Sequence, residues 1–256
     1  MQLQYYAICL LLSCNSWLGD SLYTKKNLLH IFDSKIHSAS ENMALDSNLL
    51  SQLDPNSDPI LHHYDWARPS ITYGHFIDPK KFLSLEMVEK FGIDLARRPT
   101  GGGIVFHLWD LAFSFLMPAN HPRCSTNTLE NYAFVNGAVR RVAMHLEEKM
   151  EIILSNASLK SPDCTNFCMA RPTIYDVVFE GKKVAGSAQR RTKNGYLHQG
   201  TISLKLPDLK LVKEVLLSEE VANAIGQVSF VPKIEIDKEK IKELLAESLN
   251  YFLTKS

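Results

Sequence analysis

The chain has 256 residues, and its 28 Lys and Arg balance its 28 Asp and Glu, so the formal net charge at pH 7 is zero. This length suffices for one large domain with a full hydrophobic core, or for two small ones. The charge balance excludes the strongly basic surface that is typical of nucleic-acid-binding proteins. The five cysteines are irregularly spaced and form neither a disulfide pattern nor a CxxC metal pair. We therefore predict a reducing, cytoplasmic location and no metal-ligating residues.

The first 27 residues are predicted to be an N-terminal extension whose status is left open. Residues 5–12 are apolar, but no Lys or Arg precedes them, and the run is short for a signal core. It is also far too short to cross a membrane as a helix. A secretion signal and a misassigned start site are both open for this segment, and we predict a protein without a membrane segment.

Apolar periodicity predicts alternating strands and helices in the first half of the chain. Strands are expected at residues 28–32 and 60–64, and helices at 41–53 and 82–91. Residues 104–117 have strong apolar content and are expected to form one or two strands.

The second half begins with the longest helical pattern and continues with short strands. A helix is expected at residues 128–150, and a loop rich in Ser, Asn, Asp and Pro at 155–172. Three strands follow at 177–179, 183–188 and 197–204, and two helices at 209–217 and 237–252, with Asp237 as the cap of the last one. Strands with helices segregated to one side predict an α/β (α+β) fold with a mixed sheet.

A glycine run preceded by two arginines is the most informative segment. Residues 97–107 read RRPTGGGIVFH. Three consecutive glycines are unfavourable inside a helix or strand, and they suit a loop whose backbone amides approach a ligand closely. Arg97 and Arg98 add donors that suit a phosphate or a carboxylate. A glycine-rich hairpin turn with two solvated arginines is the alternative for this segment taken alone.

A second informative segment is the strand meander at residues 175–204. A turn at Glu180 and Gly181 joins its first two strands, and Gly200 lies inside the third. Small residues around Lys183 leave space beside its ammonium group, and a lysine in such a pocket can stabilise an acyl oxygen or a phosphate. The alternative is that Lys182 and Lys183 are ordinary charges at a hairpin tip. We expect Lys183→Ala to abolish activity at little cost in stability.

Together these segments resemble the lipoate–protein ligase family, which shares its catalytic fold with biotin–protein ligases and octanoyltransferases. The matching segments are 97–107, 181–190 and 197–201, preceded in the family's order by 42–46, 64–66 and 69–74. The resemblance covers about residues 28–252. It implies one catalytic domain at residues 28–256, with a mixed or antiparallel central sheet flanked by helices and no C-terminal accessory domain.

The resemblance also implies a function. Members of the family attach a lipoyl or octanoyl group to one lysine of the lipoyl domain of 2-oxoacid dehydrogenase E2 subunits or of glycine-cleavage H protein. The expected partners are therefore these lipoyl domains and, for one route, acyl carrier protein. We expect a monomer that binds neither nucleic acid nor membrane.

The acyl group has to be activated, because hydroxide is a poor leaving group and the acceptor amine is protonated at neutral pH. In the ligase route, ATP with Mg²⁺ converts lipoate or octanoate to an acyl-adenylate. The resemblance places residues 101–103 near the adenylate, Arg98 at its phosphate and Lys183 between the phosphate and the acyl carbonyl. Gly103 favours this route, because the cysteine octanoyltransferases of this fold usually have arginine there.

In the second route a cysteine takes an octanoyl group from acyl carrier protein as a thioester and passes it on. Cys168 lies four residues before Pro172, which is where the cysteine octanoyltransferases place their nucleophile. The spacing from His107 to Ser114 and the lack of a domain after Phe252 also resemble those enzymes. An ordinary loop thiol is the alternative interpretation of Cys168.

Of the two routes we favour the ATP-dependent lipoate–protein ligase, with the octanoyl-acyl-carrier-protein:protein octanoyltransferase (or lipoyltransferase) as the alternative. A non-catalytic lipoate-binding protein is a second alternative, although loss of Lys183 or of the glycine run would be its signature and both are intact. The candidate catalytic residues are Lys183 and Cys168. The candidate substrate- or adenylate-binding residues are Arg98, Gly101, Gly102, Gly103, His107, Gly186, Ser187, Ala188, His198 and Gly200.

Overall fold

The computed structural model describes residues 28–108, 110–146, 151–152, 167, 176–205, 208–230, 232 and 237–255. Its elements, in chain order, are β1 (His30–His37), α2 (Ala39–Gln52), β2 (Ile60–Trp66), β3 (Ser70–Tyr73), η1 (Pro79–Lys81), α3 (Leu85–Lys90), β4 (Asp94–Arg97), β5 (Ile104–His107), β6 (Asp110–Pro118), α4 (Thr128–Ala143), β7 (Glu151–Ile152), β8 (Val177–Phe179), β9 (Lys182–Thr192), β10 (Gly195–Ser203), α5 (Leu209–Val215), α6 (Glu219–Val228) and α7 (Lys238–Thr254). The extension predicted at residues 1–27 and nearly all of the predicted loop at 155–172 lie outside the described residues.

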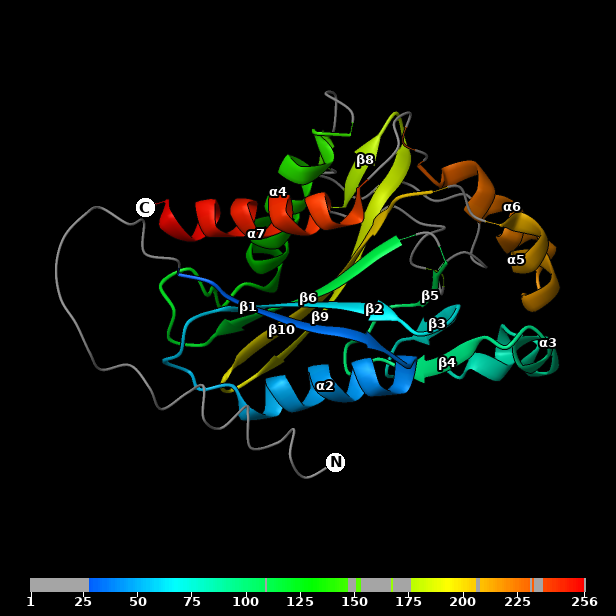
Figure 1. Ribbon diagram of the computed structural model, residues 1–256, viewed down its shortest axis with the longest axis horizontal. Coiled ribbons are helices and arrows are strands. Elements are labelled where there is room, and N and C mark those ends of the chain that lie inside the picture. The colour runs from blue at the N-terminus through cyan, green and yellow to red at the C-terminus, as the bar shows by residue number, and fades with distance from the viewer. Residues whose placement is uncertain are drawn as a thin grey trace, which may run out of the picture.

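Seven strands form the main sheet in the order β1-β2-β6-β10-β9-β8-β7. β1 and β2 run parallel, and the other neighbouring strands are antiparallel. A smaller sheet, in the order β4-β3-β5, lies beside one end of the main sheet with α3, α5 and α6 near it (Figure 1). The predicted mixed sheet flanked by helices is confirmed, and the predicted segment 104–117 divides between the two sheets.

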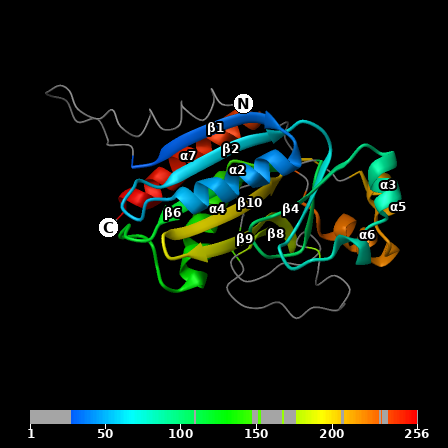
Figure 2. The same cartoon turned by 90° about the horizontal axis from the view of Figure 1, so that it is seen from below.

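Helices cover both faces of the main sheet. α4 and α7 pack on one face, and α2 crosses the other (Figures 1 and 2). Alternate residues of β6 account for this arrangement: Phe113 and Phe115 belong to the core under α4 and α7, whereas Leu116 packs with Leu50 of α2. All residues of β6 are buried, as expected for a strand covered on both faces. The segregation of helices to one side that the sequence suggested is therefore not found.

Helix ends follow local capping chemistry. At the start of α2 the Ser38 hydroxyl accepts the Glu41 N–H, and the Glu41 carboxylate accepts the Ser38 N–H. Asp237 caps α7 as predicted, because its carboxylate accepts the N–H of Glu239. α4 ends at Ala143, before the predicted boundary at residue 150. The four-residue β4 and the short α6 escape prediction from sequence, because elements of this length depend on their neighbours for stability.

The strand meander is confirmed and contains the predicted turn. Glu180 and Gly181 join β8 to β9, with φ angles of 49° and 75°. Two successive positive φ values are typical of the tight hairpin turn whose twist matches that of the flanking strands. Within the described parts of the chain, no helix has both the length and the apolar character that crossing a membrane requires.

Candidate functional site

A narrow pocket lies between the main sheet, the smaller sheet and α2. It is lined by Met43, Tyr64, Thr72, Arg98, Val105, His107, Gly186, Ser187, Ala188, Gln199, Gly200 and Thr201. Six of the candidate binding residues are therefore brought together: Arg98, His107, Gly186, Ser187, Ala188 and Gly200. The free volume is about 30 Å³, so only a water-sized group fits until a wall side chain moves. Among the apolar side chains of the wall, that of Met43 has the most rotatable bonds.

Arg98 holds the glycine run in place. Its guanidinium donates through Nη1 to the carbonyl (3.1 Å) and the hydroxyl (2.8 Å) of Thr72. Through Nη2 it donates to the carbonyls of Gly101 (3.2 Å) and Gly103 (2.6 Å). Because Arg98 is only 5% exposed, these bonds form in a largely dry environment. The guanidinium thus faces loop carbonyls, at the point where the sequence predicts a phosphate.

The glycines allow a close backbone approach between two loops. A Cβ on Gly74 would lie 1.9 Å from the carbonyl oxygen of Gly102, so no side chain fits there. Gly102 has a φ of 83°, and a Cβ on it would contact Arg98 and Ala188. By contrast, a Cβ on Gly101 would meet nothing within 4 Å. The close contact at Gly102 is therefore made with the protein's own backbone, and open space lies beside Gly101.

His107 stands at one wall of the pocket in a chain of hydrogen bonds. Its Nδ1 lies 2.6 Å from Oδ2 of Asp110, and its Nε2 lies 2.8 Å from Oγ1 of Thr72. Since Arg98 can only donate to the Thr72 hydroxyl, that hydroxyl has its proton available for Nε2, and Nδ1–H then donates to Asp110. The hydroxyl of Thr201 also donates to Oδ2 of Asp110. The sequence singled out His107 but missed Asp110, three residues later.

A second buried network ties α2 to the sheet beneath the pocket. Asp46 of α2 is fully buried, and its carboxylate accepts from Ser114 and Gln199 at 2.6 Å each. Its other oxygen lies 2.8 Å from Nδ1 of His62. Gln199 in turn accepts from the hydroxyl of Thr100 at 2.6 Å, next to the glycine run. A buried carboxylate is stable only with such donors, so this network fixes α2 relative to the glycine loop.

Lys183 is buried and ion-paired. Its Nζ lies 2.6 Å from Oδ2 of Asp176, and the two side chains are 1% and 4% exposed. Lys182, its neighbour, is exposed. The interpretation of both lysines as hairpin-tip charges is therefore wrong for Lys183. Lys183 does not line the narrow pocket itself, but Gly186 on the same strand does.

Like Lys183 and the three glycines at 101–103, His198 does not line the narrow pocket. His198 lies on the face of β10 that α4 covers, where its ring is near Phe113 and Tyr132 and its Nδ1 is 2.8 Å from Nε2 of Gln189. Complete burial lowers the pKa of His198 to about 3, so the ring is neutral. Cys168 lies outside the described residues.

Phe167 and Asp176 are the described residues nearest to Cys168 in the sequence. One contacts the residue after the glycine run, and the other contacts Lys183. Phe167 is 1% exposed and pairs with Ile104, the first residue after the glycine run. Asp176 is the ion-pair partner of Lys183. Cys124 is the cysteine that the structure does describe, and burial raises the pKa of its thiol, which makes it a poor nucleophile.

Comparisons with known proteins agree with this fold and site. The family model of the lipoyl protein ligase A/B catalytic domain matches residues 38–250. The octanoyltransferase LipM of Bacillus subtilis is 31% identical over 225 residues, which are 86% of this chain and 81% of that protein. The octanoyltransferase LipM of Carboxydothermus hydrogenoformans is 32% identical over 177 residues, 69% of this chain and 65% of that protein.

A solved structure shows the same fold. The T. acidophilum protein assigned as a lipoate protein ligase, with bound lipoic acid, has a TM-score of 0.67 at 23% identity, over 88% of this chain and 85% of that one. The resemblance inferred from the sequence is confirmed, and the names of the sequence relatives favour the octanoyltransferase alternative over the ATP-dependent ligase. With the family model covering most of its length, the chain belongs to the lipoyl protein ligase A/B catalytic domain family and is an enzyme of lipoate metabolism.

Proposed function

We propose that this protein is an octanoyltransferase. It moves an octanoyl group from acyl carrier protein to one lysine of a lipoyl domain, on a 2-oxoacid dehydrogenase E2 subunit or glycine-cleavage H protein. The observation that carries the proposal is the state of Arg98. The relatives named as octanoyltransferases support it independently.

An acyl-adenylate needs a cation free to meet its phosphate, and Arg98 was the expected one. Its guanidinium is instead bonded to Thr72 and to two carbonyls of the glycine run. A phosphate would have to break several buried, charge-assisted hydrogen bonds to recruit it. A thioester donor needs no such site, because the thiol of acyl carrier protein is already a good leaving group.

Cys168 is the proposed nucleophile. Its neighbour Phe167 pairs with Ile104 beside the glycine run, and Asp176 pairs with Lys183, so the chain reaches the site on both sides of residues 168–175. The thiolate attacks the carbonyl carbon of octanoyl-acyl carrier protein, the original C–S bond breaks, and the carrier leaves as a thiol. The lysine amine then attacks the new thioester, an amide forms, and the sulfur of Cys168 leaves and takes up a proton.

The ATP-dependent lipoate–protein ligase is the second candidate. Gly103, at the position where the transferases usually have arginine, and the fold likeness to a lipoate protein ligase support it. In that case ATP and Mg²⁺ would be required, with lipoate or octanoate as the acyl substrate. The cytoplasmic location and the monomeric state stay predictions under both candidates.

One experiment separates the two candidates. The purified protein is mixed with a lipoyl domain and either octanoyl-acyl carrier protein, or lipoate with ATP and Mg²⁺, and the intact mass of the lipoyl domain is measured. We expect addition of one octanoyl group from acyl carrier protein without ATP. Addition of a lipoyl group that depends on ATP, with no transfer from acyl carrier protein, would contradict the proposal.

A further inference from the structure

A second cavity adjoins the narrow pocket and shares His107 with it. Its volume is about 330 Å³. The lining residues come from the end of β2, the turn that follows, the β5–β6 connection and the start of α7: Asp65, Trp66, Arg68, Pro69, His107, Leu108, Asp110 and Lys238. The acyl-transfer steps described above leave this cavity without a role.

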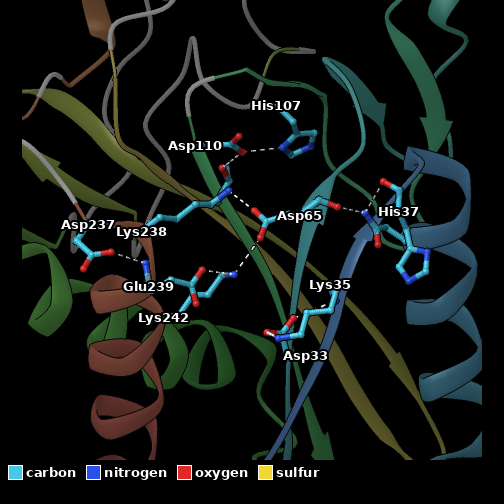
Figure 3. Close-up of polar contacts among 12 residues, drawn as sticks. Asp33, Lys35, His37, Asp65, His107, Asp110, Asp237, Lys238, Glu239 and Lys242 are labelled. Atoms are coloured by element: carbon cyan, nitrogen blue, oxygen red, sulfur yellow. Dashed lines mark hydrogen bonds and ion pairs between the residues drawn. The ribbon is translucent and has the colours of Figure 1, made fainter.

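The two cationic side chains of this cavity are already neutralised by carboxylates. Arg68 lies 3.3 Å from Asp94. Lys238 and Lys242 both reach from α7 to the carboxylate of Asp65, as Figure 3 shows. Burial acts to raise the pKa of Asp65, but the hydrogen bonds from these two lysines hold it below its ordinary value. The cavity therefore offers neither of its cations to an anionic ligand.

Asp110 offers the opposite charge. Its side chain is 4% exposed, and its Oδ2 accepts hydrogen bonds from His107 and Thr201, as Figure 3 shows for His107. Its Oδ1 is buried and has no hydrogen-bond partner among the described residues. The indole Nε1 of Trp66, in the same cavity, is likewise buried and without a partner in the described part of the chain. A buried polar atom without a hydrogen-bond partner lowers the stability of the folded protein unless a ligand or a water molecule bonds to it.

We propose that this cavity binds the side chain of the acceptor lysine, with its ammonium group hydrogen-bonded to Oδ1 of Asp110. A cationic donor meeting a buried carboxylate oxygen makes a strong, charge-assisted bond. Trp66, Pro69 and Leu108 supply apolar walls for the lysine methylenes. Because His107 also lines the narrow pocket, the amine lies next to the place where six of the candidate substrate-binding residues meet. The proposal rests on the proposed function, since it names where that reaction takes its acceptor.

The kinetic test compares Asp110→Asn with the matched control Asp33→Asn. Asp33 lies on β1 and pairs with exposed Lys35, and it lines neither cavity. For Asp110→Asn we expect kcat/KM for the lipoyl domain to fall at least about ten-fold, because a hydrogen bond to a charged group is lost. Because Asp110 also orients His107, formation of the octanoyl-enzyme without acceptor is measured on the same variant, and it should fall by less than kcat/KM for the lipoyl domain. An unchanged kcat/KM, or an equal loss in octanoyl-enzyme formation, would overturn the proposal.

A binding test examines the cavity independently of the proposed function. The indole N–H resonance of Trp66, identified by its loss in Trp66→Phe, is followed by NMR while Nα-acetyl-lysine amide or Nα-acetyl-norleucine amide is added. We expect the lysine amide to shift it, the norleucine amide to leave it unchanged, and Asp110→Asn to abolish the response. If the lysine amide shifts the Trp66 resonance but the protein modifies no lipoyl domain, the assignment of the cavity stands and the proposed function is wrong. Equal responses to both amides, or none, would overturn the assignment of the cavity.

Discussion

Lys183 and Asp176 form an ion pair of 2.6 Å, with both side chains almost completely buried. Lys183 lies on β9, and Asp176 is the first residue after Cys168 that the structure describes. Breaking one half of a buried pair leaves the other charge uncompensated, which costs far more than the loss of a surface pair. The expectation that Lys183→Ala costs little stability therefore does not agree with the structure.

Lys183→Met should abolish transfer and destabilise the protein by roughly 3–5 kcal/mol, because the buried carboxylate of Asp176 loses the ammonium group that lies 2.6 Å from it. The adjacent Lys182→Met is the matched control, since Lys182 is exposed, and it should retain both activity and stability. Chemical denaturation and the transfer assay measure the two effects. The double variant Asp176→Asn with Lys183→Met should regain stability but not activity; equal loss of activity in both single lysine variants would contradict the assignment of Lys183.

Gly74→Ala should disrupt the glycine loop, because the new Cβ would lie 1.9 Å from the carbonyl of Gly102. We expect a loss of roughly 1–3 kcal/mol, or more if the loops cannot shift, together with loss of activity. Gly101→Ala is the comparison, since its Cβ would enter open space. Its stability should stay within about 0.5 kcal/mol of wild type. Equal thermal unfolding of the two variants would mean that the loops do not pack as described.

Two buried histidines make stability depend on pH. Burial lowers the pKa of His198 to about 3; burial, and then Lys242, lower that of His63 to about 4. Both pKa values lie below the ordinary histidine value near 6.5. Between the folded-state pKa and 6.5, the unfolded chain therefore binds more protons than the folded chain. Stability contributed by the neutral rings is present above pH 6.5 and is lost as the pH falls below it.

From pH 7 to pH 5 each of these histidines should cost about 2 kcal/mol of unfolding free energy. Urea denaturation at the two pH values tests this, with His198→Gln as the diagnostic variant. The variant should lose about 2 kcal/mol less than wild type over the same interval. An identical pH dependence in the variant would show that folding does not lower the pKa of His198.

The sequence predicts the parts of this site that depend on local pattern. The glycine run, the turn at Gly181 and the cap at Asp237 are local features, and each lies where the sequence predicts it. Asp46 meets Gln199 from 153 positions away, and such long-range pairing has no local signature. The ion pair of Lys183 with Asp176 escaped prediction, because the sequence shows small residues around Lys183 but not which carboxylate packs against it.

The predicted role of Arg98 illustrates a different limit. The sequence identifies a guanidinium beside a glycine run, but it does not show which loop groups turn toward it. In the structure the carbonyls of Gly101 and Gly103 face the guanidinium. In the same place Gly102 lies against Gly74, and the N–H of Gly74 donates to the carbonyl of Gly103 at 3.2 Å. These contacts join residues far apart in the sequence, so no local pattern predicts them.

The central claim is transfer through a covalent intermediate on Cys168, and one measurement tests it directly. The protein is mixed with octanoyl-acyl carrier protein, without a lipoyl domain, and its peptides are analysed by mass spectrometry with and without hydroxylamine. Cys168→Ser and Cys124→Ser are the paired variants, since a serine hydroxyl lacks the acidity and nucleophilicity of a thiol. We expect a hydroxylamine-sensitive octanoyl group on Cys168 in wild type and in Cys124→Ser, and neither adduct nor transfer in Cys168→Ser. Full transfer by Cys168→Ser, with no adduct in wild type, would contradict the account.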